Sequence, residues 1–239
     1  MNGPETLLER MGSASRATQR SACDEAVARL RVEPQLRDAV RLLLRGENAL
    51  ARFSAAWVLF QCERPTLRLL PALLEALELP DGDLRWQAAQ MLAALGRLQS
   101  EVLPVLLHEA ESAAAPARRR MAIFVLRELA PERGETGAVY LRALEDPADD
   151  VRRAALSCFA KLTDPEPALA LRALALARGA DPDPRMARIA TVVLPELARF
   201  HPHLRGEIAT ALSELESSSD PALVRGARAA RQRLSNTDE

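Results

Sequence analysis

An alanine recurs in this chain every 33 to 37 residues, and its six copies occupy the same place in a helical pattern. An apolar residue follows most of them after four and after seven positions, which places the three side chains on one face of a helix. Repeats of this length are typical of stacked helical pairs, each packing only against its neighbours. The sequence therefore predicts an all-α solenoid. These frame alanines are Ala55, Ala88, Ala122, Ala155, Ala190 and Ala227.

Each repeat reads as two helices separated by a break rich in aspartate and proline. Aspartate at a helix start accepts hydrogen bonds from free backbone N–H groups and complements the helix dipole. The pattern predicts six repeats, which fill residues 33–234, at 33–62, 63–96, 97–130, 131–163, 164–199 and 200–234. Residues 1–32 carry helical signal without the repeat and are predicted to form an N-terminal helical cap. Residues 235–239 are predicted to form a flexible tail.

Charge and composition limit the classes of partner. The net charge is -1, so no overall positive field favours nucleic acid or an anionic membrane. The sequence has no run of about 18 apolar residues that would predict a membrane helix, and its start lacks the features of a secretion signal. The three cysteines, Cys23, Cys62 and Cys158, are scattered, which favours reduced thiols in the core. We expect a cytoplasmic protein.

Two segments resemble the second-helix signature of HEAT repeats, in particular the short bacterial type described as PBS-lyase-like. They are DDVRRAAL at residues 149–156 and DLRWQAA at residues 83–89. The resemblance implies a right-handed α-solenoid of about six helical pairs, whose second helices line a concave surface. It also implies an aspartate–arginine ladder between neighbouring repeats, interrupted at both ends where other residues replace these two. The expected structural residues of the ladder are Asp83, Arg85, Arg119, Asp150 and Arg152.

The outward stripe of the second helices is the predicted binding surface. Residues two before, two after and five after each frame alanine point away from the core face. Five of the eight aromatic residues lie on this stripe in the first three repeats, and arginine takes its first position in the later repeats. Aromatic and arginine side chains often dominate the energy of an interface. The predicted partner-binding residues are Phe53, Trp57, Phe60, Trp86, Gln90, Arg120, Phe124, Arg127, Arg153 and Arg188.

Several occupants of this surface remain open. We expect a protein or peptide that is anchored on the aromatic residues, with Arg120, Arg153 and Arg188 binding an acidic flank. Residues 1–32 could instead cover the aromatic residues, the surface could join two copies of the chain, and the arginine row could be a solvated face beside acidic neighbours. The alternative functions are nucleic-acid binding along the arginine row, as in alkylation-repair glycosylases, and a bilin lyase or chaperone.

Signs of catalysis are weak. The sequence has no glycine-rich phosphate loop and no nucleophile motif. His201 and His203 have a metal-like spacing, but no cysteine or clear carboxylate partner lies near them in the sequence. Asp149 and Asp150 lie at a predicted helix start, where capping explains them. We therefore predict a non-enzymatic binding protein without a cofactor or a metal ion.

Overall fold

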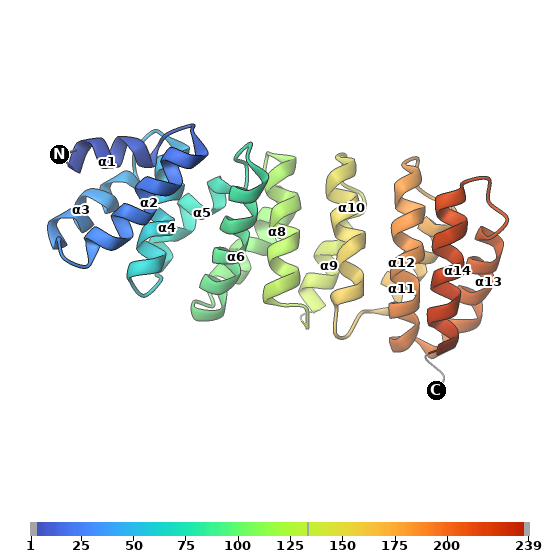
Figure 1. Ribbon diagram of the computed structural model, residues 1–239. Helices are drawn as coiled ribbons and strands as arrows, with labels where there is room; N and C mark the ends of the chain where they lie inside the picture. Colours follow the sequence, from blue (N-terminus) through green and yellow to red (C-terminus); the bar gives the residue numbers. More distant parts are fainter. Residues whose placement is uncertain (1–3, 133, 237–239) are drawn as a thin grey trace. The chain divides into compact units, whose positions relative to one another are not determined.

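The computed structural model describes residues 4–132 and 134–236, and all regular structure in these residues is helical (Figure 1). The prediction of an all-α solenoid is confirmed. The elements up to residue 112 are α1 (Pro4–Met11), α2 (Arg16–Leu30), α3 (Pro34–Leu43), α4 (Ala49–Cys62), η1 (Leu67–Leu69), α5 (Leu70–Ala76), α6 (Gly82–Leu98) and α7 (Val102–Ser112). They are followed by α8 (Pro116–Leu129), α9 (Gly134–Ala143), α10 (Asp149–Cys158), η2 (Phe159–Lys161), α11 (Pro167–Ala177), α12 (Pro184–Phe200), η3 (Pro202–Leu204), α13 (Arg205–Leu215) and α14 (Pro221–Ser235).

Six helical pairs in the described residues account for the six predicted repeats. The pairs are α3 with α4, α5 with α6, α7 with α8, α9 with α10, α11 with α12, and α13 with α14. The second helix of each pair carries the frame alanine, and all six of these alanines are 0% exposed. A larger side chain would keep the closely packed helices apart, which explains why alanine recurs at this position.

Polar side chains cap several of the second helices, as the breaks in the sequence predict. The carboxylates of Asp81, Asp183 and Asp220 accept hydrogen bonds from backbone N–H groups at the starts of α6, α12 and α14. Asn48 caps α4 in the same way. Because the first N–H groups of a helix have no partner within it, these side chains specify where the helices begin.

Residue contacts divide the chain into two compact units, residues 1–105 and 106–239. The first unit contains α1 to α6, the second contains α8 to α14, and the boundary falls within α7. The predicted cap, residues 1–32, contains α1 and α2, which pack against α3 and α4. Its separation from a solenoid at 33–234 stays a prediction. Of the predicted tail, residues 237–239 lie outside the described residues.

A buried polar contact positions α2 against α4 in the first unit. The amide of Gln19 donates to the hydroxyl of Ser54 at 2.9 Å, and this hydroxyl donates to the carbonyl of Met11 at 2.7 Å. Gln19 is 2% exposed and Ser54 is 0% exposed. Because a buried polar group without a partner costs about 1–3 kcal/mol, these bonds specify how α2 lies on α4.

In the second unit, the second helices α8, α10, α12 and α14 lie side by side in one layer (Figure 1). The first helices α9, α11 and α13 each pack against the second helix of their own pair. In α14 the position four residues after Ala227 is occupied by Arg231, which is exposed. A polar outer face of this kind allows a stack of repeats to end in water.

Replacing the frame alanine Ala155 by leucine should lower the free energy of unfolding by about 2 kcal/mol, because the larger side chain does not fit between closely packed helices. Urea denaturation followed by circular dichroism measures the change. Ser157→Leu is the matched control, since Ser157 is exposed on the same helix and its replacement should cost less than about 0.5 kcal/mol. Equal losses in both variants would contradict the buried alanine frame.

Candidate functional site

Four arginines connect second helices to the turns before them. Each lies three residues before a frame alanine, and its guanidinium donates to the backbone carbonyls five and six residues earlier. The four are Arg52, Arg85, Arg119 and Arg152. Their bonds satisfy carbonyls at the end of the preceding segment, where regular helical partners are missing. The structural role predicted for Arg85, Arg119 and Arg152 is confirmed.

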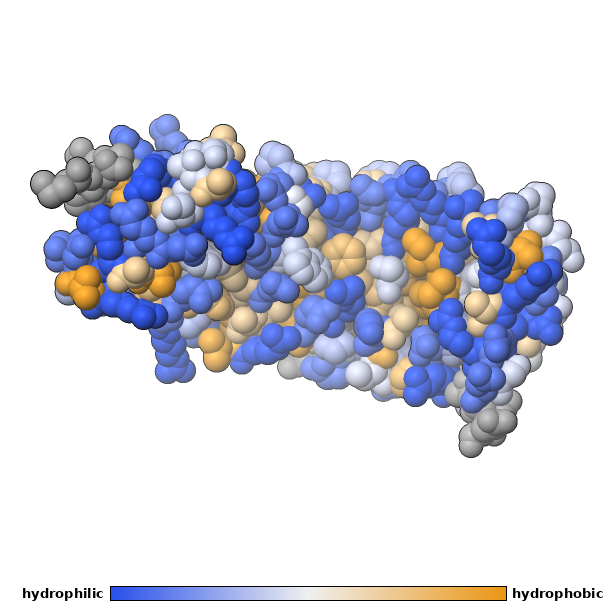
Figure 2. Space-filling view, viewed as in Figure 1, coloured by the Kyte–Doolittle hydropathy of each residue, from blue (hydrophilic) through white to orange (hydrophobic). Residues whose placement is uncertain are grey.

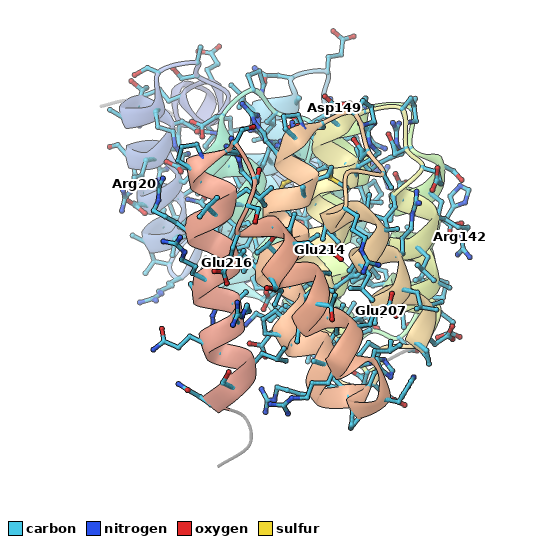
Figure 3. The ribbon with its side chains drawn as sticks, turned by 90° about the vertical axis from the view of Figure 1, so that its right-hand side faces the viewer. Arg20, Arg142, Asp149, Glu207, Glu214 and Glu216 are labelled. Carbon is cyan, nitrogen blue, oxygen red and sulfur yellow. The ribbon has the colours of Figure 1, made fainter. Side chains whose placement is uncertain are left out.

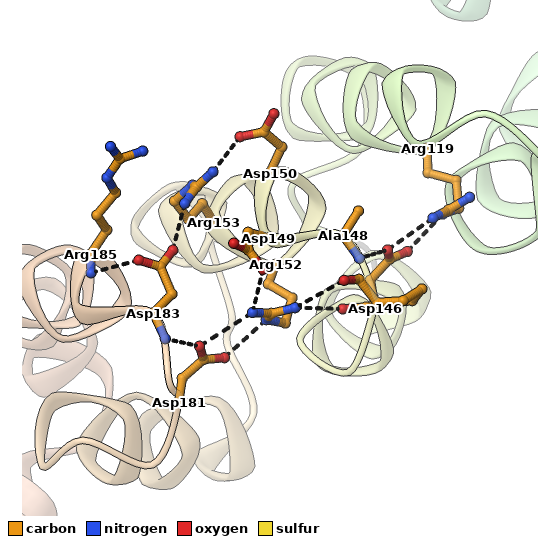
Figure 4. Close-up of polar contacts among 11 residues, drawn as sticks. Arg119, Asp146, Ala148, Asp149, Asp150, Arg152, Arg153, Asp181, Asp183 and Arg185 are labelled. Carbon is orange, nitrogen blue, oxygen red and sulfur yellow. Dashed lines mark hydrogen bonds and ion pairs between the residues drawn. The ribbon is translucent and has the colours of Figure 1, made fainter.

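Three of these arginines also form ion pairs with the next repeat, as a ladder requires, and Figure 4 shows those of Arg119 and Arg152. The contacts are Arg52 with Glu75 at 2.5 Å, Arg119 with Asp146 at 2.6 Å, and Arg152 with Asp181 at 2.9 Å. The expected interruption is therefore wrong between the first two repeats, where Glu75 of α5 supplies the carboxylate. Arg85 forms no ion pair with the third repeat among the described residues, so the ladder is interrupted there. At the C-terminal end, Ala187 and Val224 occupy the arginine position, so the ladder stops there as expected.

The expected ladder acids Asp83 and Asp150 are corrected by the structure. Asp83 is exposed in the first turn of α6, and Asp150 contacts Arg120 and Arg153 of the outward stripe. In the second unit the ladder uses the aspartate nine residues before the frame alanine, whereas the sequence signature marks the one five residues before it. The signature therefore identified the arginines of the ladder but not their acidic partners.

The outward arginine row of the second unit is paired with aspartates. Three of its arginines, Arg120, Arg153 and Arg188, each contact a carboxylate at the start of the next second helix. The contacts are Arg120 Nη1 to Asp150 Oδ2 at 3.4 Å, Arg153 Nη1 to Asp183 Oδ2 at 2.5 Å, and Arg188 Nε to Asp220 Oδ2 at 2.8 Å. Figure 4 shows Arg153 between its two acidic neighbours. This arrangement supports the reading of a charged face beside acidic neighbours, since an anionic ligand must displace carboxylates to reach these arginines.

The arginines lower the pKa values of the carboxyl groups that they contact. The hydrogen bond from Arg153 lowers the pKa of Asp150 below its ordinary value. At Asp146 burial acts to raise the pKa, but hydrogen bonds from Arg119 and from the N–H group of Ala148 outweigh burial, and the pKa is lowered. Both carboxyl groups are therefore held in the ionised form in the folded state.

Acid should destabilise the second unit for this reason. A carboxyl group whose pKa is lower in the folded state contributes its full stabilisation above its unfolded pKa, and the stabilisation is lost as the pH falls through the folded pKa. We expect the urea midpoint to stay constant from about pH 7 to about pH 5 and to fall below about pH 4. Arg153→Gln should lower the midpoint at neutral pH and make its pH dependence shallower. A wild-type midpoint that does not change on acidification would contradict these ion pairs.

The aromatic part of the predicted surface lies in the first unit and is partly covered by α2. Phe53 is only 2% exposed, so its expected place on the surface is wrong, because α2 packs along α4 there. Trp57 and Phe60 are half-buried. Trp86 on α6 is 41% exposed, and Gln90 on the same helix is exposed. Coverage by the N-terminal segment therefore applies to Phe53 and in part to Trp57, and it leaves Trp86 at the surface.

A pocket of about 170 Å³ lies between α2, α4 and α6 in the first unit. Its lining residues are Arg16, Gln19, Arg20, Cys23 and Asp24 of α2, Phe53, Ser54 and Trp57 of α4, and Gln87 of α6. The indole of Trp57 thus borders a space whose α2 side is polar and charged. Trp86 directly precedes Gln87 on α6, so the exposed tryptophan belongs to the helix that forms one side of the pocket.

The contribution of α2 to this pocket could not be found from the sequence. This helix carries no frame alanine, and Arg16 and Arg20 read there as ordinary surface charges. Their position depends on which face of α2 contacts α4, and the buried bond between Gln19 and Ser54 determines that face. No pattern within α2 alone indicates this contact.

The aromatic residue of the stripe in the second unit has a different environment. The guanidinium of Arg127 lies 5.3 Å from the ring centroid of Phe124 in a cation–π contact, and both side chains are half-buried. Figure 2 shows a mostly hydrophilic surface over this part of the chain, with hydrophobic atoms over α12, where Val192 is 49% exposed. The two parts of the predicted stripe therefore differ. In the first unit it borders a pocket through Trp57, and in the second unit most of its arginines are paired with carboxylates.

The cysteines and histidines were also candidates for chemistry. All three cysteines are free, and burial raises the pKa of Cys23 and raises that of Cys158 to about 11. The ring centroids of His201 and His203 are 5.9 Å apart. In the part of the chain that the structure describes, no group of three or more histidine, cysteine, aspartate or glutamate residues is placed to bind a metal ion. Among the same residues, no helix combines the length and the apolar character that crossing a membrane requires.

Comparison with known proteins supports a helical-repeat fold. Residues 40–127 match the family model of HEAT repeats. The crystal structure of an engineered protein is similar with a TM-score of 0.52 and 17% identity, over 98% of this chain and 68% of that one. A designed armadillo repeat protein gives a TM-score of 0.47 and 13% identity, over 97% of this chain and 99% of that one. The complex of CpcE and CpcF of phycocyanin lyase from Nostoc sp. PCC7120 gives a TM-score of 0.39 and 20% identity, over 98% of this chain and 95% of that one.

No curated protein matches the chain. The engineered protein with a TM-score of 0.52 is only 17% identical and indicates the fold alone, because one fold carries many unrelated functions. The HEAT-repeat part of the resemblance is supported by the match at residues 40–127, and the short bacterial PBS-lyase-like subtype stays a prediction.

Proposed function

We propose that the chain is a non-enzymatic module that binds a protein or peptide, and that the pocket between α2, α4 and α6 is its binding site. The observation that carries the proposal is the half-buried indole of Trp57 at the edge of this pocket. Tryptophan offers a large apolar area with few rotatable bonds, and such residues in pockets dominate many interfaces. Trp86, which is 41% exposed, extends the apolar surface on α6.

The volume of the pocket favours a side chain of a partner over a cofactor. Pockets that hold drug-sized ligands or cofactors measure about 300–1,000 Å³. The volume here is about 170 Å³. A bilin is too large for it, whereas one apolar side chain of a bound peptide fits. This size argument supports protein binding over the bilin lyase or chaperone alternative at this site.

Nucleic-acid binding along the arginine row is the second candidate, and the geometry supports it less. Affinity for nucleic acid depends on cations that can replace the counterions of phosphates. Arg120, Arg153 and Arg188 each contact an aspartate, so their charges are already balanced within the fold. The net charge of -1 adds no general attraction for phosphates.

Capture from a nuclease-treated lysate of the native host tests the proposal. The immobilised full chain should retain a protein after nuclease treatment, and raising the salt from about 50 to about 200 mM should change retention little. Material that disappears with nuclease, or affinity that falls about a thousandfold over this salt range, would favour nucleic acid instead. Recovery of this chain alone would indicate self-association.

A further inference from the structure

Two arginines of α2 line the pocket of the first unit, and they differ in whether their guanidinium groups already have partners within the fold. Arg16 donates to Gln19 at 2.9 Å and lies 3.8 Å from a carboxylate oxygen of Asp81 at the start of α6. Arg20, one turn further along α2, is exposed (labelled in Figure 3). Within residues 4–132 and 134–236 its side chain takes part in no hydrogen bond or ion pair. Its guanidinium is therefore available to a ligand in the pocket.

The charges that line the pocket favour an anionic group. Two of the charged lining residues are arginines and one is an aspartate, Asp24. A guanidinium presents its N–H donors in a planar fork that matches the two oxygens of a carboxylate. Trp57 borders the same pocket, so an apolar group next to the carboxylate would be buried at the same time. A peptide with an acidic residue beside a large apolar residue combines both features.

We propose that the first unit binds a peptide segment in which an apolar side chain packs on Trp57 and a neighbouring carboxylate binds Arg20. This inference rests on the proposed function and adds the chemistry of the partner. It assigns recognition of the acidic residue to α2, because the arginine row of the second unit is already paired with aspartates. Asp24 lies one turn beyond Arg20, lines the same pocket, and would repel the bound carboxylate.

Selection from a random-peptide display library on the immobilised full chain provides the test. Peptides enriched on the wild-type chain should share aspartate or glutamate next to leucine, phenylalanine or tryptophan. Selection on Arg20→Glu should lose the acidic residue from the shared pattern. One wild-type-selected peptide, measured by isothermal titration, should bind Arg20→Glu about tenfold more weakly and Asp24→Asn more tightly than the wild-type chain.

Arg31→Glu is the matched control. It makes the same change of charge at the exposed C-terminal end of α2, about 16 Å along the helix from Arg20. This variant should bind the selected peptide within about twofold of the wild-type chain. Circular dichroism should give the same helix content for all variants, because the exposed side chain of Arg20 makes no hydrogen bond or ion pair within the described residues.

The outcomes distinguish failure of the acidic-partner proposal from failure of the proposed peptide-binding function. Enriched peptides that need Trp57 but carry no acidic residue, or that bind Arg20→Glu as well as the wild-type chain, would overturn the acidic partner and leave the proposed function standing. Equal weakening by Arg31→Glu would overturn it too, since only the general charge of α2 would then matter. Failure to enrich any peptide would overturn both the acidic partner and the peptide-binding pocket.

Discussion

Replacing Trp57 and Trp86 together by alanine is expected to weaken partner binding by at least about 100-fold. Truncation of a tryptophan that anchors an interface costs about 2 kcal/mol or more, and two such losses exceed the 2.7 kcal/mol that corresponds to this factor. Trp57 borders the pocket, and Trp86 is exposed on α6, the helix that contributes Gln87 to the pocket. The measurement is the affinity of the captured partner, or of a selected peptide, for the full chain.

Two further variants make this result specific. Trp57→Phe with Trp86→Phe keeps an aromatic ring at both positions and should recover most of the affinity, which separates loss of a contact from loss of the fold. Phe124→Ala changes the aromatic residue of the stripe in the second unit, where Arg127 covers the ring, and should leave the affinity within about twofold. If the folded double alanine variant binds as tightly as the wild-type chain, the pocket is not the binding site.

Replacing Arg119 by alanine should lower the free energy of unfolding by about 3–5 kcal/mol, because it leaves a buried carboxylate without its partner. Arg119 and Asp146 have side chains that are 11% and 9% exposed and are joined by two hydrogen bonds, at 2.6 and 2.9 Å. The same arginine also donates to the carbonyls of Ala113 and Ala114, which would lose a donor. Urea denaturation followed by circular dichroism measures the loss.

Arg142→Ala is the control for this prediction. Arg142 also contacts a carboxylate of another helix, Glu111, but its side chain is 59% exposed. Ion pairs in water contribute about 0–1 kcal/mol, so this variant should unfold close to the wild-type midpoint. A second variant, Arg119→Leu with Asp146→Asn, removes both charges and should be more stable than Arg119→Ala. Equal small effects of Arg119→Ala and Arg142→Ala would show that the ladder contributes no more than a surface ion pair.

The repeat could be predicted from the sequence because its physical cause is local. A frame alanine such as Ala88 or Ala122 must be small wherever two helices approach closely, so its spacing reveals the helical pairs directly. Aspartates such as Asp81 cap the helix that follows them within three residues. Both features depend on neighbours in the chain or on the same position of the next repeat, and the structure confirms both.

The candidate surface could be predicted only in part, because it depends on contacts between distant segments. The stripe identified Trp57 and Trp86, but Phe53 at an equivalent position is covered by α2, a helix outside the repeat. The pairing of Arg153 with Asp183 joins residues 30 positions apart, and helical periodicity carries no information on such a pair. The packing of α2 on α4 therefore helps to decide which residues of the stripe are exposed in the first unit.

Hydrogen–deuterium exchange of the full chain, with and without a selected peptide, tests the central claim most directly. The account predicts that the peptide slows exchange in α2, in the middle of α4 and in the first half of α6, which surround the pocket. Exchange in α8, α10, α12 and α14 should not change. Protection of these four helices, with none in α2 or α4, would contradict the account and place the binding site in the second unit.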